Sequence, residues 1–543
     1  MKKFRVLVLA LVLVMALFAQ SAMACTIVSV GKDATTDGST ISTHNDDSTG
    51  ADFRLWIIPS MEGGEGVQRD IVMDSHNYGD FGDYPNTKDY GKGTLIATMD
   101  QPEDTIAYLH SRYSFINAKG VAMGESTFSC DRDFYDSDIY KAIYAKDGII
   151  DCWNCQDIAL ERATTAKEAV EIMGKLCEDY IWYDAGETIN VCDGTDVWIF
   201  EAYGGTLWAA VRMPDDMFFV SANRARINEF DFNDPENYLC SSTMKDFAIE
   251  QGLWTEDSGE PFTPADFFAP YHGDYSRNRE WRAFSLVAPS QEFDLDAYRY
   301  PLFVKPDEKL SVFDVFKLKG DYYAGTDLDA SRFATSGDFG NPLNFNNPTR
   351  TINMYRTCYL MLANVKAWLP EELRCLVWYG YGAPDSSFLT PLWASQTTLP
   401  SYYDHGSRYL PYDPTSGWWI NTLVQDTATR MYNVAIQKIY EVRDERMLAQ
   451  IEEVGEKQEA WAKMFEEGKK EEAMEELNTY ANDTANAWFE DWLKLSDELI
   501  STTVWSRLNQ DNRIAGGSYS DWYKEIMDNA PMKPLPTEEE AAQ

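Results

Sequence analysis

The stretch CTIVSVGKDATTDGSTISTHNDD, residues 25–47, contains two strand-like runs on either side of a turn-like segment, GKDATTDG. Gly and Asp in the middle segment favour a turn, and the β-branched residues around it favour strands. We therefore predict a hairpin centred near Thr35, in which the numbers of paired positions sum to about 70. Cys25 then lies opposite Asn45, with two aspartates just beyond. The hairpin thus predicts carboxylates beside the thiol.

The residues before this stretch have the pattern of an export signal. Three cations lie within the first five residues, an almost wholly apolar run covers residues 6–18, and Ala22 and Ala24 occupy positions −3 and −1 relative to Cys25. This pattern is typical of a secretory signal peptide. The run is shorter than the about 20 residues that a membrane span needs. We expect residues 1–24 to be removed between Ala24 and Cys25, giving a secreted or periplasmic protein.

The composition is that of a large, strongly acidic globular protein. The 543 residues carry a formal net charge of −41, and 44% of them are apolar and 14% aromatic. A large core is therefore expected. The negative field repels polyanions, so we expect no nucleic-acid partner and, once the signal is removed, no membrane partner. Whether copies of the chain form a homo-oligomer stays open at this stage.

The chain has nine cysteines and five histidines. If Cys25 is set aside, the remaining cysteines are even in number, which permits complete pairing in an oxidising compartment. Cys152 and Cys155 form a C-x-x-C motif, for which a structural disulfide or two free thiols is favoured over a zinc site, because no second such motif follows. No histidine pair has metal-ligand spacing. We therefore expect neither a metal nor a cofactor.

Short strand-like runs dominate residues 25–225. Four of them, within residues 187–223, are separated by turns containing Gly, Pro or Asp, which predicts an antiparallel meander. Residues 157–180 instead have helical spacing, with apolar residues on one broad face. Strands combined with separate helical segments predict an α+β layered fold.

The C-terminal part of the chain has a different pattern. Beyond residue 420 the sequence turns helical and charged, and residues 437–454 and 484–501 both have the spacing of amphipathic helices. We interpret residues 421–530 as a helical region packed on the catalytic layer, and residues 531–543 as a loose tail. The catalytic domain is then expected over residues 25–420.

Cys25 gains a special chemical role if it begins the mature chain. A free α-amine has a pKa of about 7.7–8.0, so that part of it is neutral at physiological pH. It can take a proton from its own side chain, and one residue then supplies both nucleophile and base. A carboxylate such as Asp47 can hold the ammonium group, and a nearby cation can lower the pKa of the thiol. This predicts that Cys25 is a nucleophile that carries its own base.

Six ordered motifs between Cys25 and Trp393 resemble a known enzyme family. They are residues 25–47, NAKGVAMGESTF at 117–128, DVWIFEAYGGTLWAAVRMPDD at 196–216, FVSANRARI at 219–227, YSRNREWRAF at 275–284 and LVWYGYGAPDSSFLTPLW at 376–393. Together they resemble the cysteine dipeptidases of the dipeptidase A type, of the N-terminal nucleophile (Ntn) hydrolase superfamily. The resemblance implies a four-layer αββα sandwich of two mostly antiparallel sheets, and hydrolysis of a small peptide substrate.

The resemblance also implies roles for particular residues. The catalytic set comprises Cys25 as nucleophile, Asp47 beside the α-amine, Asn223 as oxyanion donor and Arg279 near the nucleophile. Four further residues are candidates for substrate binding: His44, which stands where the family usually has arginine, Asp46, Thr127 near an oxyanion-side position, and Arg282. The carboxyl of Asp46 suits a dipeptidase, because such an enzyme must recognise the free amine of its substrate.

Three alternatives stay open from the sequence. More distant relatives in the superfamily, penicillin V acylase and bile salt hydrolase, imply an amidase that acts on N-acyl amides. A cysteine after small residues also fits a lipoprotein anchor, although such sites usually have leucine where this chain has Ala22. The 17 tryptophans and 31 tyrosines fit a non-catalytic binding protein with an aromatic groove.

Overall fold

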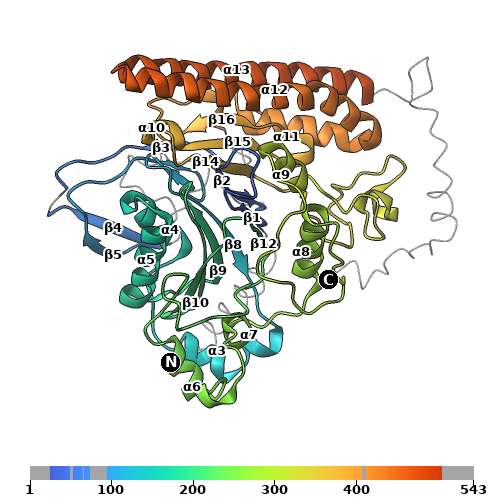
Figure 1. Ribbon diagram of the computed structural model, residues 1–543. Coiled ribbons are helices and arrows are strands. Elements are labelled where there is room, and N and C mark those ends of the chain that lie inside the picture. Colours follow the sequence, from blue (N-terminus) through green and yellow to red (C-terminus); the bar gives the residue numbers. More distant parts are fainter. Residues whose placement is uncertain (1–24, 49–52, 65, 74–93, 407–410, 504–543) are drawn as a thin grey trace, which may run out of the picture.

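The computed structural model describes residues 25–48, 53–64, 66–73, 94–406 and 411–503. Two antiparallel sheets lie face to face, and helices cover the outer face of each (Figure 1). This is the four-layer α+β arrangement expected from the sequence, so the predicted fold class is confirmed. The expected signal peptide (1–24) and tail (531–543) lie outside the described residues.

The first sheet contains the strand that follows Cys25. Its six strands have the spatial order β12-β1-β2-β14-β15-β16, and all neighbouring strands are antiparallel. Their bounds are β1 Ile27–Val30, β2 Thr40–Asp46, β12 Phe218–Ser221, β14 Tyr359–Val365, β15 Leu376–Tyr381 and β16 Thr390–Trp393. Every residue of β1 and β2 is buried, because this sheet is covered on both faces.

The second sheet has eight strands in the order β13-β11-β10-β9-β8-β7-β6-β3. Their bounds are β3 Trp56–Ile58, β6 Tyr108–His110, β7 Ile116–Asn117, β8 Ala122–Phe128, β9 Gly186–Cys192, β10 Val197–Gly204, β11 Leu207–Arg212 and β13 Tyr238–Cys240. A separate ribbon pairs β4, Gln68–Met73, with β5, Thr94–Asp100. The central strands β8 and β9 pack against β1 and β2 of the first sheet, and this contact positions the site described below.

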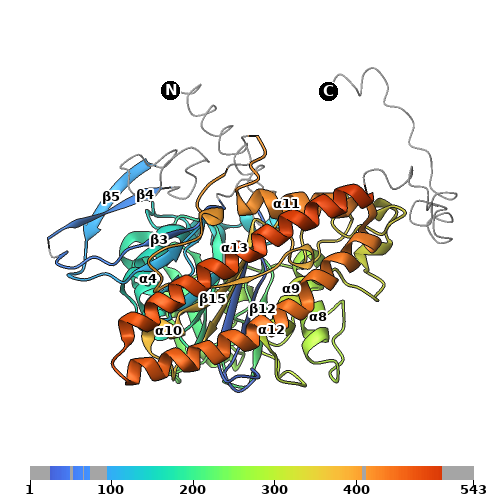
Figure 2. The ribbon, with the colours of Figure 1, turned by 90° about the horizontal axis from the view of Figure 1, so that it is seen from above.

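Two groups of helices form the outer layers. On the second sheet lie α4, Cys152–Arg162, and α5, Ala166–Leu176. On the first sheet lie α8 Asp274–Val287, α9 Val312–Lys319, α11 Gly417–Ala428 and α13 Lys470–Thr503. The long helix α12, Tyr432–Glu466, runs beside α13, and Figure 2 shows the pair crossing the molecule. The shorter helices are α2 Arg132–Tyr135, α3 Asp138–Ile143, α6 Met244–Glu250, α7 Pro264–Phe268 and α10 Glu371–Arg374.

The predicted hairpin forms, with a register one residue from the expected one. Ser29 pairs with Ser42 and Val30 with Ile41, so paired numbers sum to 71. Continued to the start of the strand, this register places Cys25 opposite Asp46. The carboxylates therefore lie beside Cys25, as the local pattern predicted.

The predicted four-strand meander is wrong in its last strand. β9, β10 and β11 are consecutive neighbours in the second sheet, but β12 crosses to the first sheet and pairs with β1. The four residues of β12 are all buried and do not alternate as a strand with one solvated face does. The chain crosses over at Asp215 and Met217, whose carbonyls accept hydrogen bonds from Asp33 and Gly31. Pairing with β12 also covers an edge of β1 that would otherwise be open.

The helical pattern at 157–180 corresponds to two helices. α4 begins earlier than predicted, at Cys152, where the Asp151 side chain accepts a hydrogen bond from the backbone N–H of Asn154. The helix ends at Arg162, and a new one starts behind Thr165, whose extended backbone and hydroxyl cap α5. The apolar face stays continuous across the break because both helices pack on the second sheet.

The nine cysteines all lie within the described residues, and none of them forms a disulfide there. The complete pairing that was possible for the eight cysteines other than Cys25 does not occur, and Cys152 and Cys155 lie buried in α4 without a disulfide. Among the described helices, none has the length and hydropathy that a membrane-spanning segment requires.

Candidate active site

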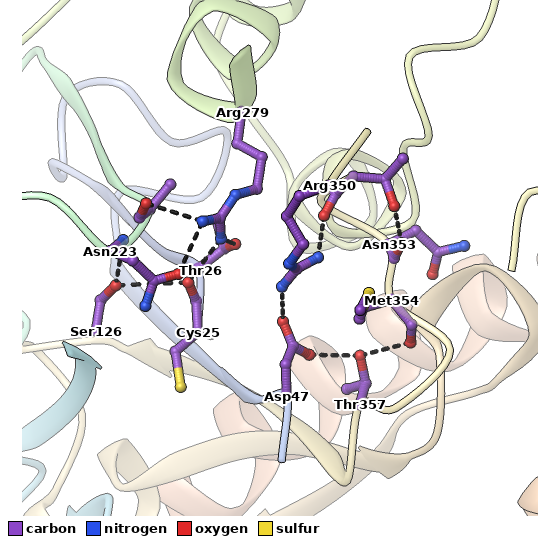
Figure 3. Close-up of polar contacts among 12 residues, drawn as sticks. Cys25, Thr26, Asp47, Ser126, Asn223, Arg279, Arg350, Asn353, Met354 and Thr357 are labelled. Atoms are coloured by element: carbon purple, nitrogen blue, oxygen red, sulfur yellow. Dashed lines mark hydrogen bonds and ion pairs between the residues drawn. The ribbon is translucent and has the colours of Figure 1, made fainter. Parts of the chain in front are cut away.

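Cys25 lies at the start of β1, between β12 and β2. Ile27 pairs with Ser221, so the antiparallel register continued by two residues brings Asn223 opposite Cys25. The Cys25 side chain is 1% exposed. Figure 3 shows its carbonyl directed toward Arg279 and its sulfur directed away. Cys25 therefore faces hydrogen-bond donors on the side of its carbonyl, which is the Arg279 side. The side to which its sulfur points is the thiol side.

Arg279 from α8 holds the backbone of Cys25 (Figure 3). Its Nη1 donates to the Cys25 carbonyl at 2.9 Å and to Thr26 Oγ1 at 2.8 Å. Its Nη2 donates to the Ala222 carbonyl at 2.9 Å and to Asn223 Oδ1 at 2.8 Å. Burial and the neighbouring charge of Arg350 lower the pKa of Arg279 to about 10, and the guanidinium stays charged at neutral pH. Arg279 thus ties β1 to the chain that follows β12.

Asn223 presents its amide at the same place. Its backbone has a φ of 63°, a left-handed conformation that Asn tolerates better than most residues. The side-chain Nδ2 donates to the Thr127 carbonyl at 2.6 Å, and the backbone N–H donates to Ser126 Oγ at 2.9 Å. The second N–H of the amide has no acceptor among the described residues. A fixed amide with one free N–H is the kind of donor that an oxyanion requires.

Asp47 lies on the Arg279 side of Cys25, next to the end of β2. Its carboxylate forms an ion pair with Arg350 and accepts a hydrogen bond from Thr357 Oγ1 at 2.6 Å (Figure 3). All three groups are buried. Arg279 and Arg350 therefore supply positive charge near Cys25.

A buried lysine completes this side of the site. Lys319, the last residue of α9, donates from Nζ to the Thr26 carbonyl. Burial lowers the pKa of Lys319 to about 7, against the smaller opposing effects of Asp47 and Cys25. The amine is therefore close to half protonated at neutral pH.

The thiol side is formed by His44 of β2 and Glu125 of β8. The Cys25 thiol donates to Glu125 Oε1, with Sγ and Oε1 2.9 Å apart. His44 Nε2 lies 3.0 Å from the same oxygen and 3.4 Å from Sγ. His44 Nδ1 lies 3.2 Å from the Tyr359 hydroxyl, which orients the ring. The Cys25 thiol is thus held by a carboxylate and an imidazole from two different sheets.

The carboxylates decide the protonation state of this cluster. Burial raises the pKa of the Cys25 thiol well above its usual value, and the charges of Glu125, Asp46 and Asp47 raise it further. Burial also acts against ionised Glu125, but the hydrogen bond and charge of His44 outweigh it and lower the pKa of Glu125 to about 2. Burial and the charge of Glu125 raise the pKa of Glu187 well above its usual value. Cys25 is therefore a thiol beside an ionised Glu125.

The remaining predicted residues have different positions. Asp46 is buried on the thiol side, and its Oδ2 has no hydrogen-bond partner among the described residues. Thr127 Oγ1 donates to Glu125 Oε2 at 3.3 Å, and its carbonyl holds Asn223. Arg282 forms an ion pair with Asp321 at 2.7 Å and is not brought into the contacts around Cys25.

Comparison with known proteins identifies the family of the chain. The sequence model of peptidase family C69 matches residues 24–445, most of the chain. The chain belongs to peptidase family C69. This confirms the resemblance seen in the sequence, and the protein is a peptidase.

Curated relatives of this C69 peptidase are named as dipeptidases. A probable dipeptidase A of Streptococcus pyogenes serotype M3 (strain SSI-1) is 27% identical over 421 residues, which cover 76% of this chain and 84% of the relative. A probable dipeptidase of Salmonella dublin is 27% identical over 410 residues, 72% and 83% of the two chains. A dipeptidase of Bifidobacterium longum (strain NCC 2705) is 25% identical over 463 residues, 77% and 80%.

Three residues of the C69 site were not identified from the sequence. Glu125 lies two residues before Thr127 on the same face of β8, so strand alternation applied to Thr127 could have identified it. Arg350 lies in a loop and Lys319 at the end of a helix, more than 270 residues from Asp47 and Thr26 in sequence. No local pattern marks either of them, because their roles depend on tertiary contacts.

Proposed function

We propose that this C69 peptidase is an exported dipeptidase in which Cys25 is the nucleophile and its own α-amine is the base. The observation that carries the proposal is the position of Cys25: Arg279 binds its carbonyl, and the register continued from β12 places the fixed Asn223 amide opposite it. The relatives' names support dipeptides as substrates. The proposal requires that the bond between Ala24 and Cys25 is cut, which frees the amine.

The first step follows from the protonation state of the thiol. Because the surroundings favour S–H over the thiolate, attack must be coupled to removal of the proton. The neutral α-amine of Cys25 accepts that proton, directly or through one water, as sulfur forms a bond to the carbonyl carbon of the substrate. The ionised carboxylate of Asp47, already held by Arg350 and Thr357, stabilises the resulting ammonium group.

The second step needs a donor for the developing oxyanion. The free N–H of the Asn223 amide suits this role, because its other N–H and its Oδ1 are held by Thr127 and Arg279. When the tetrahedral intermediate collapses, the C–N bond breaks and the ammonium group returns the proton to the leaving amine. Water then attacks the thioester, with the same amine as base, and releases the acid and the Cys25 thiol.

Asp46 supports a substrate with a free amine. Its buried carboxyl, with one oxygen without a partner among the described residues, lies on the thiol side of Cys25. Burial raises the pKa of Asp46, and the charge of Arg112 opposes this effect. A substrate ammonium group would offset the cost of keeping that carboxylate ionised and buried. We therefore place the amino end of a small peptide near Asp46.

The signal-like N-terminus supports export to the periplasm or the outside, followed by cleavage between Ala24 and Cys25. The net charge of −41 supports a small peptide as partner, rather than nucleic acid or an anionic membrane. A homo-oligomer is compatible with the proposal and is not required by it.

The test compares free and N-acetylated forms of a dipeptide panel, on protein whose N-terminus at Cys25 has been verified by mass spectrometry. We expect thiol-dependent hydrolysis of the free dipeptides and a rate that is lower by about 10²-fold or more for the acetylated forms. Asp46→Asn should raise KM for free dipeptides, whereas Asp138→Asn, on the exposed face of α3, should not. Equal rates on free and acetylated substrates would favour an N-acyl amidase instead. An unmodified Cys25 excludes the lipoprotein alternative.

A further inference from the structure

Cys25, His44 and Glu125 bring three different metal-ligand atoms together. Sγ, Nε2 and Oε1 all lie within 4.8 Å of one another. The pairs are 2.9 Å apart for sulfur and oxygen, 3.0 Å for nitrogen and oxygen, and 3.4 Å for sulfur and nitrogen. The residues come from the start of β1, from β2 and from β8, and each is at most 1% exposed. The sequence spacing gave no sign of this group, because the residues belong to three strands and two sheets.

The triangle is close to the size that a tetrahedral zinc ion needs. Zinc binds cysteine sulfur at about 2.3 Å and histidine nitrogen or carboxylate oxygen at about 2.0–2.2 Å. At tetrahedral angles, these bond lengths put the ligand atoms about 3.4–3.6 Å apart. The observed edges therefore have to open by about 0.2–0.7 Å. Small rotations of the three side chains achieve this without a change in the backbone.

Neighbouring groups already orient the two non-sulfur ligands. The Tyr359 hydroxyl contacts His44 Nδ1, so Nε2 is the nitrogen that points toward Cys25. The rings of Tyr113 and Tyr359 meet the imidazole edge-on, at centroid distances of 5.2 and 5.4 Å. Thr127 Oγ1 binds the other oxygen of Glu125, which leaves Oε1 facing the sulfur. Hydrogen bonds of this kind to a ligand's second polar atom are typical of protein metal sites.

The charge of the site also suits a dication. Glu125, which contacts the sulfur, and Asp46 contribute negative charge on the thiol side, and Arg112 beside Asp46 offsets part of it. A divalent ion stabilises the thiolate and compensates the carboxylates at the same time. Of the common divalent ions, zinc combines an affinity for thiolate and imidazole with a tolerance for carboxylate.

We propose that Cys25, His44 and Glu125 form a zinc-binding site, and that zinc in it reversibly blocks the nucleophile. Binding forms bonds from zinc to Sγ, Nε2 and Oε1, and it releases to solvent both the thiol proton and the proton that His44 Nε2 donates to Glu125. The fourth position takes water or, on a chain that begins at Cys25, the α-amine, which closes a five-membered ring with the sulfur. Binding does not depend on the proposed function, but inhibition does, since it requires Cys25 to be the nucleophile.

The test titrates Zn²⁺ into the reduced, chelator-treated protein in competition with a chromophoric chelator. We expect one equivalent to bind, and dipeptide hydrolysis to fall in proportion to occupancy and to return on addition of EDTA. Co²⁺ in place of Zn²⁺ should produce a thiolate-to-metal charge-transfer band, which Cys25→Ser removes. Retention of that band in Cys25→Ser would overturn the assignment of the sulfur ligand.

Variants of the other two ligands locate the metal. His44→Gln and Glu125→Gln should each weaken Zn²⁺ binding by at least about tenfold. A matched control, His405→Gln, should bind like the unaltered protein, because it removes a partly exposed imidazole beside Asp404 and Asp413. Circular dichroism checks that each variant is folded, and either ligand variant alone is sufficient for the test.

The outcomes distinguish failure of the zinc site from failure of the proposed dipeptidase function. Zinc binding that depends on His44, in a protein that hydrolyses no dipeptide, supports the metal site and contradicts the dipeptidase assignment. Cys25-dependent hydrolysis without zinc binding, or with binding unaltered in both ligand variants, overturns the metal site and leaves the dipeptidase. Loss of the bound equivalent in His405→Gln would show a surface site and overturn the proposal.

Discussion

The Cys25 thiol donates a hydrogen bond to the Glu125 carboxylate, with Sγ and Oε1 2.9 Å apart. This relationship favours the protonated sulfur, whereas a neighbouring cation would favour the thiolate. Arg279, which binds the Cys25 carbonyl, and Arg350, which binds Asp47, lie on the other side of Cys25, and Arg112 lies close to Asp46. The site therefore needs a base for each turnover, and this requirement leads to the first prediction.

Removal or blocking of the base should be nearly as damaging as removal of the nucleophile. Cys25→Ala should abolish dipeptide hydrolysis and leave the melting temperature within a few degrees of its original value, and Cys25→Ser should be severely impaired because a hydroxyl is a weaker nucleophile. One extra residue before Cys25 keeps the thiol but converts the amine into an amide, which cannot accept the proton. Steady-state rates on protein with a verified N-terminus measure all three.

The control for this prediction is the His44→Gln variant of both the trimmed and the extended chain. An untrimmed extended chain with full activity would show that another group is the base. If that activity disappears in extended His44→Gln, the imidazole 3.4 Å from the sulfur is that group.

Asn223→Gly should lower kcat by about 10²–10³-fold with a much smaller change in KM, because the amide is lost as oxyanion donor. Glycine is chosen because it accepts the φ of 63° at this position without strain, so the backbone is preserved. Asn228→Gly is the matched control and should keep normal turnover, since the Asn228 side chain hydrogen-bonds, within the described part of the chain, only to the Tyr300 carbonyl, at 3.5 Å. A kcat within threefold of the original in Asn223→Gly would remove Asn223 from the mechanism.

Asp47→Ala should destabilise the fold as well as reduce activity. The substitution leaves the buried Arg350 without its carboxylate partner, and breaking a buried ion pair in this way costs about 3–5 kcal/mol. The double variant Asp47→Ala with Arg350→Met should recover part of that loss, since no uncompensated charge remains. Urea unfolding of the four proteins in the double-mutant cycle measures the coupling. Equal stabilities for the single and the double variant would contradict the prediction.

Lys319 should make stability depend on pH in a defined window. Burial lowers the pKa of Lys319 from an ordinary value of 10.5 to about 7, so between these values the unfolded chain binds more protons than the folded one. Stability from this residue is therefore complete above about pH 10.5 and is lost as the pH falls toward 7. Relative to Lys319→Met, the unaltered protein should gain stability between pH 7 and 10, by at most about 5 kcal/mol.

The measurement is the difference in the free energy of unfolding between the two proteins at several pH values. Lys366→Met serves as control, because the side chain of Lys366 is 12% exposed and carries an ion pair with Asp37 outside the site. A difference between unaltered protein and Lys319→Met that stays constant across the window would show that Lys319 has an ordinary pKa.

Local signals in the sequence determined the first hairpin and the residues that meet at its open end. Alternating β-branched runs around a turn predicted β1 and β2, and the register was wrong by only one residue. The predicted register placed Cys25 next to a strand start, with Asp46 and Asp47 beside it. This placement is correct, because the pairing of two strands across a short turn depends on nearby residues alone. The resemblance of the ordered motifs added Asn223 and Arg279, and both lie in contact with each other next to Cys25.

Tertiary structure alone decided how the site is completed. The local pattern of β12 is that of a fourth meander strand, but burial on both faces and the open edge of β1 place it in the other sheet. Glu125 reaches the sulfur only because β8 packs across β2. Arg350 and Lys319 reach Asp47 and Thr26 from distant segments, since buried charges and carbonyls must find partners wherever the fold brings them. Sequence therefore determined the position of Cys25 and its hairpin. Packing of the two sheets decided the protonation state of the thiol, because burial and long-range contacts set the pKa of a buried group.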